Sequence, residues 1–289
     1  MNDSILEAIG NTPLIRLKEI EVKYNINAHL YAKLEYFNPF GSIKDRAALQ
    51  IIEDAEKNHD IESGIIVESS SGNLGIALSA IANLRGYKAT IVIPENMSAS
   101  RFKLLEKYGA NIIKTKYGGM SEAIDVAHRI AISEGGYFCD QFNNISSIKA
   151  HIISTAPEID NALNGNIDAI ICGIGSGGTI SGVGTYFKSK GYHTKILGVE
   201  PNLYPHKIPG IGAGFTPSIL NLSIIDGIYQ IDYEDAIQKC EALLKHNSVL
   251  VGISSGAILH AGLEYAKKSE NYKQNVVMIF PDSGERYLW

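Results

Sequence analysis

Residues 168–180 read DAIICGIGSGGTI. The run from Asp168 to Cys172 is short, apolar and rich in isoleucine, which is typical of a strand buried on both faces of a sheet. A glycine-rich segment, Gly173 to Thr179, follows it and opens a helix that continues to about Lys188. A buried strand, a tight turn and a helix in this order are the repeating unit of a parallel α/β sheet.

The same alternation extends in both directions along the chain. The pattern predicts strands at 64–67, 89–93, 111–114, 196–200, 228–231 and 276–280, and helices at 45–57, 98–108, 120–133, 147–163, 233–246 and 255–269. Residues 70–83 are predicted to form a loop and then a helix. A polar break near 140–148 separates two such series. We therefore predict an α/β fold of two three-layer units, each with a mostly parallel, twisted sheet.

Composition excludes several classes of protein. The chain has 289 residues, 45% of them hydrophobic, and its charge is 26 − 31 = −5. No basic patch indicates a nucleic-acid partner, no apolar run is long enough to span a membrane, and the first residues do not resemble a signal peptide. Three scattered cysteines predict free thiols in the cytoplasm, and eight histidines without ligand spacing predict no metal site.

A lysine stands in an unusual position in the segment from Asn38 to Arg46, NPFGSIKDR. Pro39 and Gly41 interrupt the chain before a helix, so Lys44 is expected in the first helical turn. The positive end of the helix dipole disfavours a cation there and lowers the lysine pKa. Such a lysine can form a Schiff base. The alternative is a solvated lysine beside an ordinary helix cap.

Four polar loops follow predicted strands, at the sheet edge where open α/β folds bind ligands. They are the serine-rich loop 68–75, the glycine-rich loop 173–179, the loop 251–257 and the loop 280–287. The serine-rich loop suits a carboxylate, and the glycine-rich loop suits a phosphate held by backbone N–H groups. The alternatives are an ordinary helix cap for the serine-rich loop, close packing of helix on sheet for the loop 251–257, and a polar chain terminus for the loop 280–287.

The glycine-rich loop also matches the dinucleotide-binding pattern Gly-x-Gly-x-x-Gly, and Glu200 at the end of the next strand keeps that interpretation open. No Lys-Ser/Thr pair follows the glycines, which excludes a Walker phosphate loop. Together, a phosphate cradle, a Schiff-base lysine and a carboxylate pocket are what pyridoxal phosphate and an amino-acid substrate require.

In these motifs the chain resembles the cysteine synthase (O-acetylserine sulfhydrylase) family. This family has the fold type II of pyridoxal-phosphate enzymes, which is also the fold of the tryptophan synthase β-subunit. Ordered matches cover nearly the whole chain: Asn11–Leu14, Asn38–Arg46, Ser71–Asn73, Gln141–Phe142, Pro157–Ile159, Gly175–Thr179, Gly210–Phe215, Gly252–Gly256 and Gly284–Leu288. So many matches in order argue against a dinucleotide site.

The resemblance implies pyridoxal 5'-phosphate as cofactor and a role for each matching residue. Lys44 forms the Schiff base and moves the α-proton. The other cofactor-binding residues are Asn73 at the ring hydroxyl, Ser283 at the pyridine nitrogen, and Gly175, Ser176, Gly177, Gly178 and Thr179 at the phosphate; the substrate-binding residues are Ser70, Ser71, Gly72, Leu74 and Gln141. A smaller, mobile domain (37–147) would carry the substrate loop, and a larger domain (1–36 and 148–289) the phosphate loop.

Three departures from the family pattern bear on the reaction. Leu74 replaces a threonine of the carboxylate loop but keeps its backbone N–H, and Ile145 and Ile148 replace two prolines. Asp232 stands where the family has a small hydroxyl residue. It is a good N-cap for the following helix, with Asp235 three residues on. It also ends a strand, where a carboxylate can activate water and repel hydrosulfide.

We therefore expect β-elimination or β-replacement through an α-aminoacrylate, with L-cysteine and water giving L-serine and hydrogen sulfide. The alternatives are cysteine synthesis from O-acetylserine and sulfide, addition of an amine as in diaminopropionate-type synthases, and a catalytically silent binding protein on the same fold. The family implies a homodimer acting on a small amino acid, with no nucleic-acid or membrane partner.

Overall fold

The computed structural model describes residues 3–70, 72–95, 97–116, 119–268 and 273–287. The chain forms two compact units. Unit 1 comprises Met1–Ile9 and Lys44–Ser147, and unit 2 comprises Gly10–Ile43 and Ile148–Trp289. Residues 1–9 thus group with unit 1 although the larger domain was predicted for them, and residues 37–43 group with unit 2 although the smaller domain was predicted for them. The division into a mobile and a fixed domain stays a prediction.

Unit 1 is a parallel sheet with helices on both faces. Its strand order is β5-β4-β3-β6, and its strands are β3 (Ile65–Ser69), β4 (Lys88–Pro94), β5 (Asn111–Thr115) and β6 (Tyr137–Phe138). Its helices are α2 (Lys44–Lys57), α3 (Asn73–Arg85), α4 (Ala99–Lys107) and α5 (Gly119–Glu134), and α6 (Ser146–Ala150) begins in unit 1 and ends in unit 2. Apolar residues of α5 pack on one face of the sheet, and those of α3 and α4 on the other.

Unit 2 is built on a six-stranded sheet of order β1-β2-β10-β7-β8-β9, in which only β1 is antiparallel to its neighbour. The strands are β1 (Leu14–Arg16), β2 (His29–Leu34), β7 (Ala169–Gly173), β8 (Lys195–Pro201), β9 (Gly227–Ile231) and β10 (Asn275–Phe280). The helices are α1 (Lys18–Lys23), α7 (Ala156–Leu163), α8 (Gly178–Ser189), α9 (Tyr233–Asn247) and α10 (Ile253–Lys267). Short helical turns are η1 (Ile5–Ala8, in unit 1), η2 (Glu35–Phe37), η4 (Leu222–Ile224) and η5 (Gly284–Arg286).

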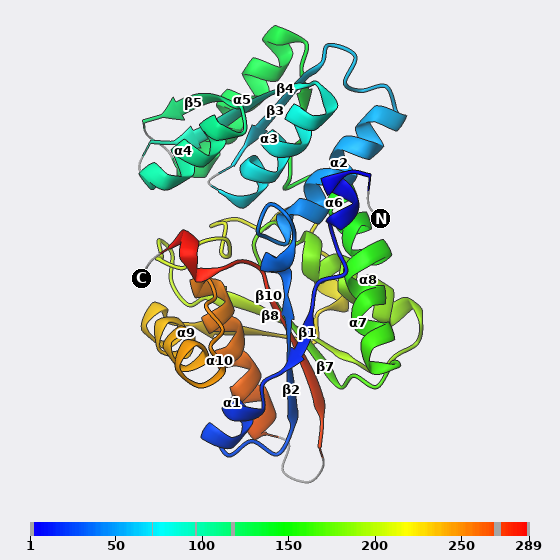
Figure 1. Cartoon of the computed structure of the whole chain (residues 1–289), viewed down its shortest axis with the longest axis vertical. Helices are drawn as coiled ribbons and strands as arrows, with labels where there is room; N and C mark the ends of the chain where they lie inside the picture. The colour runs from blue at the N-terminus through cyan, green and yellow to red at the C-terminus, as the bar shows by residue number, and fades with distance from the viewer. Residues whose placement is uncertain (1–2, 71, 96, 117–118, 269–272, 288–289) are drawn as a thin grey trace. The chain divides into compact units, whose positions relative to one another are not determined.

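Strand β10 shows how this sheet is buried on both faces. Its alternate residues Val276 and Met278 face the core formed with α1, α9 and α10, whereas Val277 and Ile279 face the core formed with α7 and α8. Figure 1 shows α9 and α10 on one side of these strands and α7 and α8 on the other. The predicted α/β class with mostly parallel sheets is confirmed.

The helix predicted over 147–163 is confirmed in its extent, but its middle is π-helical. The chain forms α6, then a π-helical segment η3 (His151–Thr155), then α7. Pro157 lies at the start of α7, where its missing N–H costs least. Isolated π-turns often occur where function requires a locally widened helix. Apolar periodicity does not reveal them, because one inserted residue shifts the hydrogen bonds without a distinctive residue type.

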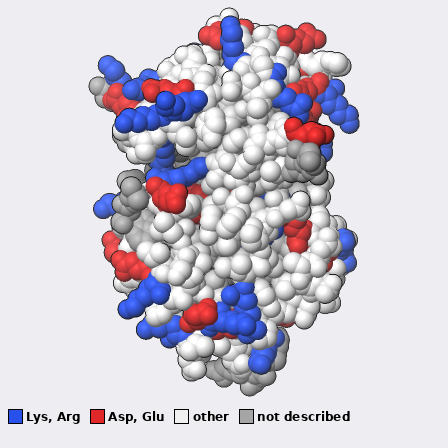
Figure 2. All heavy atoms as spheres, viewed as in Figure 1, with Lys and Arg blue, Asp and Glu red and all other residues white. Residues whose placement is uncertain are grey.

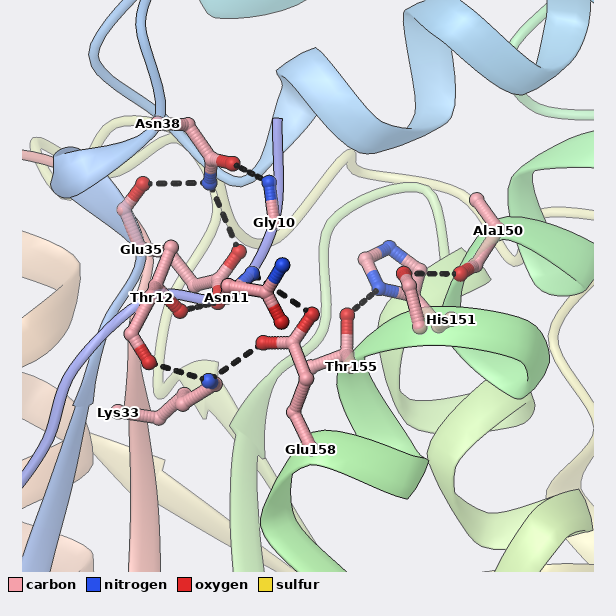
Figure 3. Close-up of polar contacts among 11 residues, drawn as sticks. Gly10, Asn11, Thr12, Lys33, Glu35, Asn38, Ala150, His151, Thr155 and Glu158 are labelled. Carbon is pink, nitrogen blue, oxygen red and sulfur yellow. Dashed lines mark hydrogen bonds and ion pairs between the residues drawn. The ribbon is translucent and has the colours of Figure 1, made fainter. Parts of the chain in front are cut away.

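Charged side chains are interspersed by sign on the face shown in Figure 2. Lys33, in contrast, is a charged residue of the protein interior, because its side chain is only 2% exposed. Its Nζ donates to the Thr12 carbonyl oxygen at 2.6 Å and pairs with the Glu158 carboxylate at 2.6 Å, and Glu158 also accepts from the Asn11 N–H at 2.9 Å (Figure 3). This buried ion pair connects residues 11–12 to α7, and so explains two of the motifs on which the resemblance rests.

Candidate active site

The glycine-rich loop lies at the carboxyl end of β7, and the loop opens α8 as predicted. Gly177 is the N-cap of α8 with φ +87°, a left-handed conformation that glycine adopts without strain. The first N–H groups of α8 have no acceptor within the helix and lie at the positive end of its dipole. This arrangement of main-chain donors suits a phosphate group.

Two glycines of this loop are required by close packing. A Cβ on Gly175 would overlap the carbonyl oxygen of Gly210, and one on Gly177 would lie 2.9 Å from the Cβ of Leu220. The loop is therefore pressed against the insert between β8 and β9. The Gly212 N–H donates to the Ile174 carbonyl at 2.8 Å, which fixes the insert to the loop.

Ser283 and Asp232 lie at the same edge of the unit 2 sheet as the glycine-rich loop. Ser283 follows β10 and caps η5, where its Oγ accepts from the Glu285 N–H at 3.3 Å. Asp232 follows β9 and occupies the N-cap position of α9. Its side chain makes no capping hydrogen bond, so the interpretation of Asp232 as a side-chain cap is wrong. Instead its Oδ1 accepts from Nδ2 of Asn202, which follows β8.

Lys44 is the first residue of α2 in unit 1. Desolvation lowers its pKa to about 8, and the charge of Glu68 opposes this effect. Glu68 is fully buried at the end of β3. Desolvation, followed by the charge of Asp140, raises the pKa of Glu68 to about 8. A lysine that loses its proton near neutral pH can attack an aldehyde, so the environment fits the predicted Schiff-base role.

The serine-rich loop leads from β3 into α3. Ser70 Oγ accepts from the N–H groups of Gly72, at 3.2 Å, and Gly75, at 3.0 Å, which leaves its own proton to donate to a ligand. Asn73 and Leu74 are the first residues of α3, and the Leu74 side chain is buried at 2% exposure. Leu74 can therefore offer a ligand its first-turn N–H. Ser71 lies outside the described residues.

Gln141 follows β6 and is held by the end of β3. Its Nε2 donates to Glu68 Oε1 at 3.3 Å and to the Ser69 carbonyl at 3.1 Å. These bonds bring Gln141 next to the serine-rich loop, as predicted. A substrate carboxylate would have to replace one of these two acceptors to be bound by this amide group.

Two residues of the site were not identified from the sequence. Glu68 was read as the start of a polar loop, although it is the buried end of a strand that faces a lysine. His151 was read as part of a helix, although its Nε2 lies 3.1 Å from Thr179 Oγ1 of the glycine-rich loop. The only sequence signal for Glu68 was a glutamate at the end of an apolar strand. No sequence feature indicated the role of His151.

The pKa of Glu68 predicts an unusual pH dependence of stability in the cofactor-free protein. The native state keeps this proton up to about pH 8, whereas an unfolded carboxyl loses it near its ordinary value of 4.5. Between these values the native state binds more protons, so the free energy of unfolding falls as pH rises, by at most about 1.4 kcal/mol per pH unit. Glu68→Gln should flatten the slope measured by urea unfolding between these pH values.

A matched control is Glu106→Gln, which removes an exposed carboxylate of the same unit on α4. It should keep the wild-type slope. Lys44 acts with the opposite sign and at higher pH, since its lowered pKa makes the native state bind fewer protons between about 8 and its ordinary 10.5. A wild-type slope in Glu68→Gln would show that Glu68 is ionised in the fold.

Comparison with known proteins identifies the class defined by this fold and these loops. Residues 5–282 match the family described as "Pyridoxal-phosphate dependent enzyme". A cysteine synthase from Staphylococcus aureus is 40% identical over 298 residues, which cover 99% of this chain and 95% of the relative. The chain therefore belongs to the family of pyridoxal-phosphate dependent enzymes and is a homologue of cysteine synthases.

Solved structures agree with this assignment. A cysteine synthase from Entamoeba histolytica has 37% identity and a TM-score of 0.95, and the match covers 100% of this chain and 89% of that one. A hydrogen sulfide-producing enzyme from Fusobacterium nucleatum has 36% identity and a TM-score of 0.94, over 99% and 100% of the two chains. An O-ureido-L-serine synthase has 33% identity and a TM-score of 0.95, over 100% and 94%.

The predicted family, fold type, enzyme class and cofactor are confirmed by these relatives. The roles of individual site residues, including Lys44, Asn73 and Ser283, stay predictions. Within the described ranges, no helix has both the length and the apolar character that crossing a bilayer requires. Side chains of His, Cys, Asp and Glu form no group of three or more suited to a metal ion in the same part of the chain.

Proposed function

We propose that this enzyme converts L-cysteine and water into L-serine and hydrogen sulfide. The observation that carries the proposal is the carboxylate of Asp232 at the carboxyl edge of the unit 2 sheet. Its Oδ1 accepts from Asn202, and its side chain takes no part in capping α9. Residues at this edge are the ones that meet ligands in open α/β sheets.

The residues fit the cofactor that the family uses. The cradle of Gly175 to Thr179 suits its phosphate, and Lys44 has the low pKa needed to meet its aldehyde. When bound, pyridoxal phosphate withdraws electrons from the α-carbon of the substrate, so that a proton and a β-substituent can leave. In this proposal Lys44 Nζ takes the α-proton, and the hydroxyl of Ser70 donates to the substrate carboxylate.

Asp232 then decides what attacks the β-carbon. A carboxylate accepts a proton from water, and a correctly placed base contributes about 10²- to 10⁴-fold to such a step. The same negative charge disfavours the approach of a hydrosulfide anion. The bond to Asn202 fixes the orientation of the carboxylate while its Oδ2 has no hydrogen bond among the described residues. The hydrogen sulfide-producing neighbour is in keeping with this direction.

Asp232→Asn should lower the rate of serine release from L-cysteine by about 10²-fold or more, because an amide cannot take a proton from water. The asparagine keeps the size of the side chain and its contact with Asn202. The measurement is the rate of serine formation by chromatography, with sulfide measured in the same samples.

The matched control is Glu234→Gln, which removes the same charge two residues away on the exposed first turn of α9. It should release serine at the wild-type rate. Equal serine release by wild type and Asp232→Asn would contradict the role of Asp232. Cysteine formation from O-acetylserine and sulfide that exceeds cysteine breakdown by wild type would favour the second candidate, the reaction of the Staphylococcus aureus relative.

A further inference from the structure

A buried histidine outside the glycine-rich loop reaches a side chain of that loop. His151 is the first residue of the π-helical segment η3 and is 3% exposed. Its Nδ1 lies 2.8 Å from the hydroxyl oxygen of Thr155, a fully buried residue one turn further on, as Figure 3 shows. Its Nε2 lies 3.1 Å from Oγ1 of Thr179. The imidazole thus connects the inside of η3 with the first turn of α8.

The packing of α8 against η3 makes this contact specific. A Cβ on Gly182 would lie 2.7 Å from the Cβ of His151 and would crowd the carbonyl oxygen of Ile148. Gly182 is one turn after Thr179 on α8. The absence of a side chain there lets the two helical segments approach closely enough for the imidazole to reach the threonine hydroxyl.

The Thr155 hydroxyl, the His151 imidazole and the Thr179 hydroxyl form a chain of hydrogen bonds. The protons that each group carries determine which group donates to which. A threonine hydroxyl has one proton. If Thr179 donates it to a phosphate oxygen, its oxygen must accept from the Nε2–H of His151. Nδ1 of the neutral imidazole is then an acceptor, and the hydroxyl of Thr155 can donate to it. In the opposite tautomer, Nε2 would accept the Thr179 proton and compete with the phosphate.

We propose that Thr155 and His151 are positioning residues that orient the hydroxyl proton of Thr179 toward the cofactor phosphate. With the phosphate as final acceptor, Thr155 donates to Nδ1 of His151, and the Nε2–H of His151 fixes Thr179 as a donor. The proposal rests on the assignment of the glycine-rich loop to the phosphate, which belongs to the proposed function.

The test compares two ligands, pyridoxal 5'-phosphate and pyridoxal, which lacks the phosphate. Each is titrated into the full-length protein after removal of its cofactor, and its dissociation constant is measured from the absorbance of the ligand. His151→Leu should weaken binding of pyridoxal phosphate about tenfold, since the Thr179 hydroxyl loses the donor that holds its proton toward the charged phosphate. Binding of pyridoxal should stay within about twofold of wild type. Thr155→Val should show a smaller change in the same direction.

Three variants act as controls. His151→Gln keeps a donor near the position of Nε2 and should recover most of the affinity. Ser154→Ala removes a neighbouring hydroxyl of η3 that donates to the Ala150 carbonyl at 2.6 Å, and it should bind both ligands as wild type does. In the double variant Thr179→Val/His151→Leu, the effects should not add, because His151 acts on the phosphate only through the Thr179 hydroxyl.

The outcomes separate this proposal from the one on which it rests. If Thr179→Val weakens pyridoxal phosphate but His151→Leu does not, the role of His151 is overturned and the phosphate loop stands. If His151→Leu weakens both ligands equally, the residue supports the fold only, and the proposal is overturned. If Thr179→Val changes neither ligand, the phosphate assignment of Thr179 itself fails, and the proposal fails with it.

Discussion

Lys44→Ala should lower the rate of sulfide release from L-cysteine by at least about 10³-fold at saturating cofactor. The substitution removes both the amine that meets the cofactor aldehyde and the base that takes the α-proton. The lowered pKa of about 8 makes the neutral amine available near neutral pH. Alanine is favourable in helices, so α2 should still form. The measurement is initial sulfide release, with cofactor binding followed by absorbance.

Two further lysine variants make this prediction specific. Lys44→Arg keeps the charge but cannot lose its proton, so it should be as inactive as Lys44→Ala. Lys57→Ala removes an exposed lysine in the last turn of the same helix. It should retain wild-type turnover. Its free energy of unfolding should fall by less than about 1 kcal/mol, because a cation is lost from the negative end of the helix dipole. Turnover by Lys44→Ala at more than a tenth of the wild-type rate would contradict the proposed role.

Gly175→Ala should weaken binding of pyridoxal phosphate by about 10²-fold or more, because hydrogen bonds to a charged phosphate contribute about 1.5–3 kcal/mol each. The added Cβ would overlap the backbone carbonyl oxygen of Gly210. Because the obstacle is backbone, the loop or the insert must move. Either movement displaces the N–H groups that the phosphate requires. The measurement is the dissociation constant of the cofactor.

The control for this prediction is Gly227→Ala at the start of β9. A Cβ there would meet Leu197 at 3.5 Å, which is ordinary van der Waals contact. Gly227→Ala should bind the cofactor as tightly as wild type. Circular dichroism of both variants distinguishes a displaced loop from an unfolded protein. Wild-type cofactor affinity in a folded Gly175→Ala variant would show that this loop does not hold the phosphate.

The α/β fold could be predicted because its strands are short, apolar and followed by polar loops. The glycine-rich loop at the end of β7 and Lys44 at the start of α2 lie where the local pattern placed them. The lowered pKa of Lys44 was also expected, but its cause is desolvation and not the helix dipole. The π-helical segment within the 147–163 helix could not be predicted, because the hydrogen-bond shift at His151 leaves the apolar pattern unchanged. The contact of His151 with Thr179 joins residues that are 28 positions apart.

Asp232 shows the limit of local reasoning in the candidate site. By sequence it is a good helix cap, and by position it is the N-cap of α9. Its side chain nevertheless bonds Asn202, which lies 30 residues earlier on a neighbouring strand end. Only the register of β8 and β9, with Pro201 beside Ile231, brings the two side chains together. Local propensity therefore predicted the position of Asp232 but not the contact that its carboxylate makes.

The proposed reaction is tested most directly by supplying the wild-type enzyme with L-cysteine as its only amino-acid substrate and measuring every product. Cysteine hydrolysis through the Asp232 carboxylate predicts sulfide and serine in equal amounts, both falling together in Asp232→Asn. Sulfide with pyruvate in place of serine would contradict water addition at the β-carbon. No sulfide from cysteine, with rapid cysteine formation from O-acetylserine and sulfide, would contradict the proposed direction altogether.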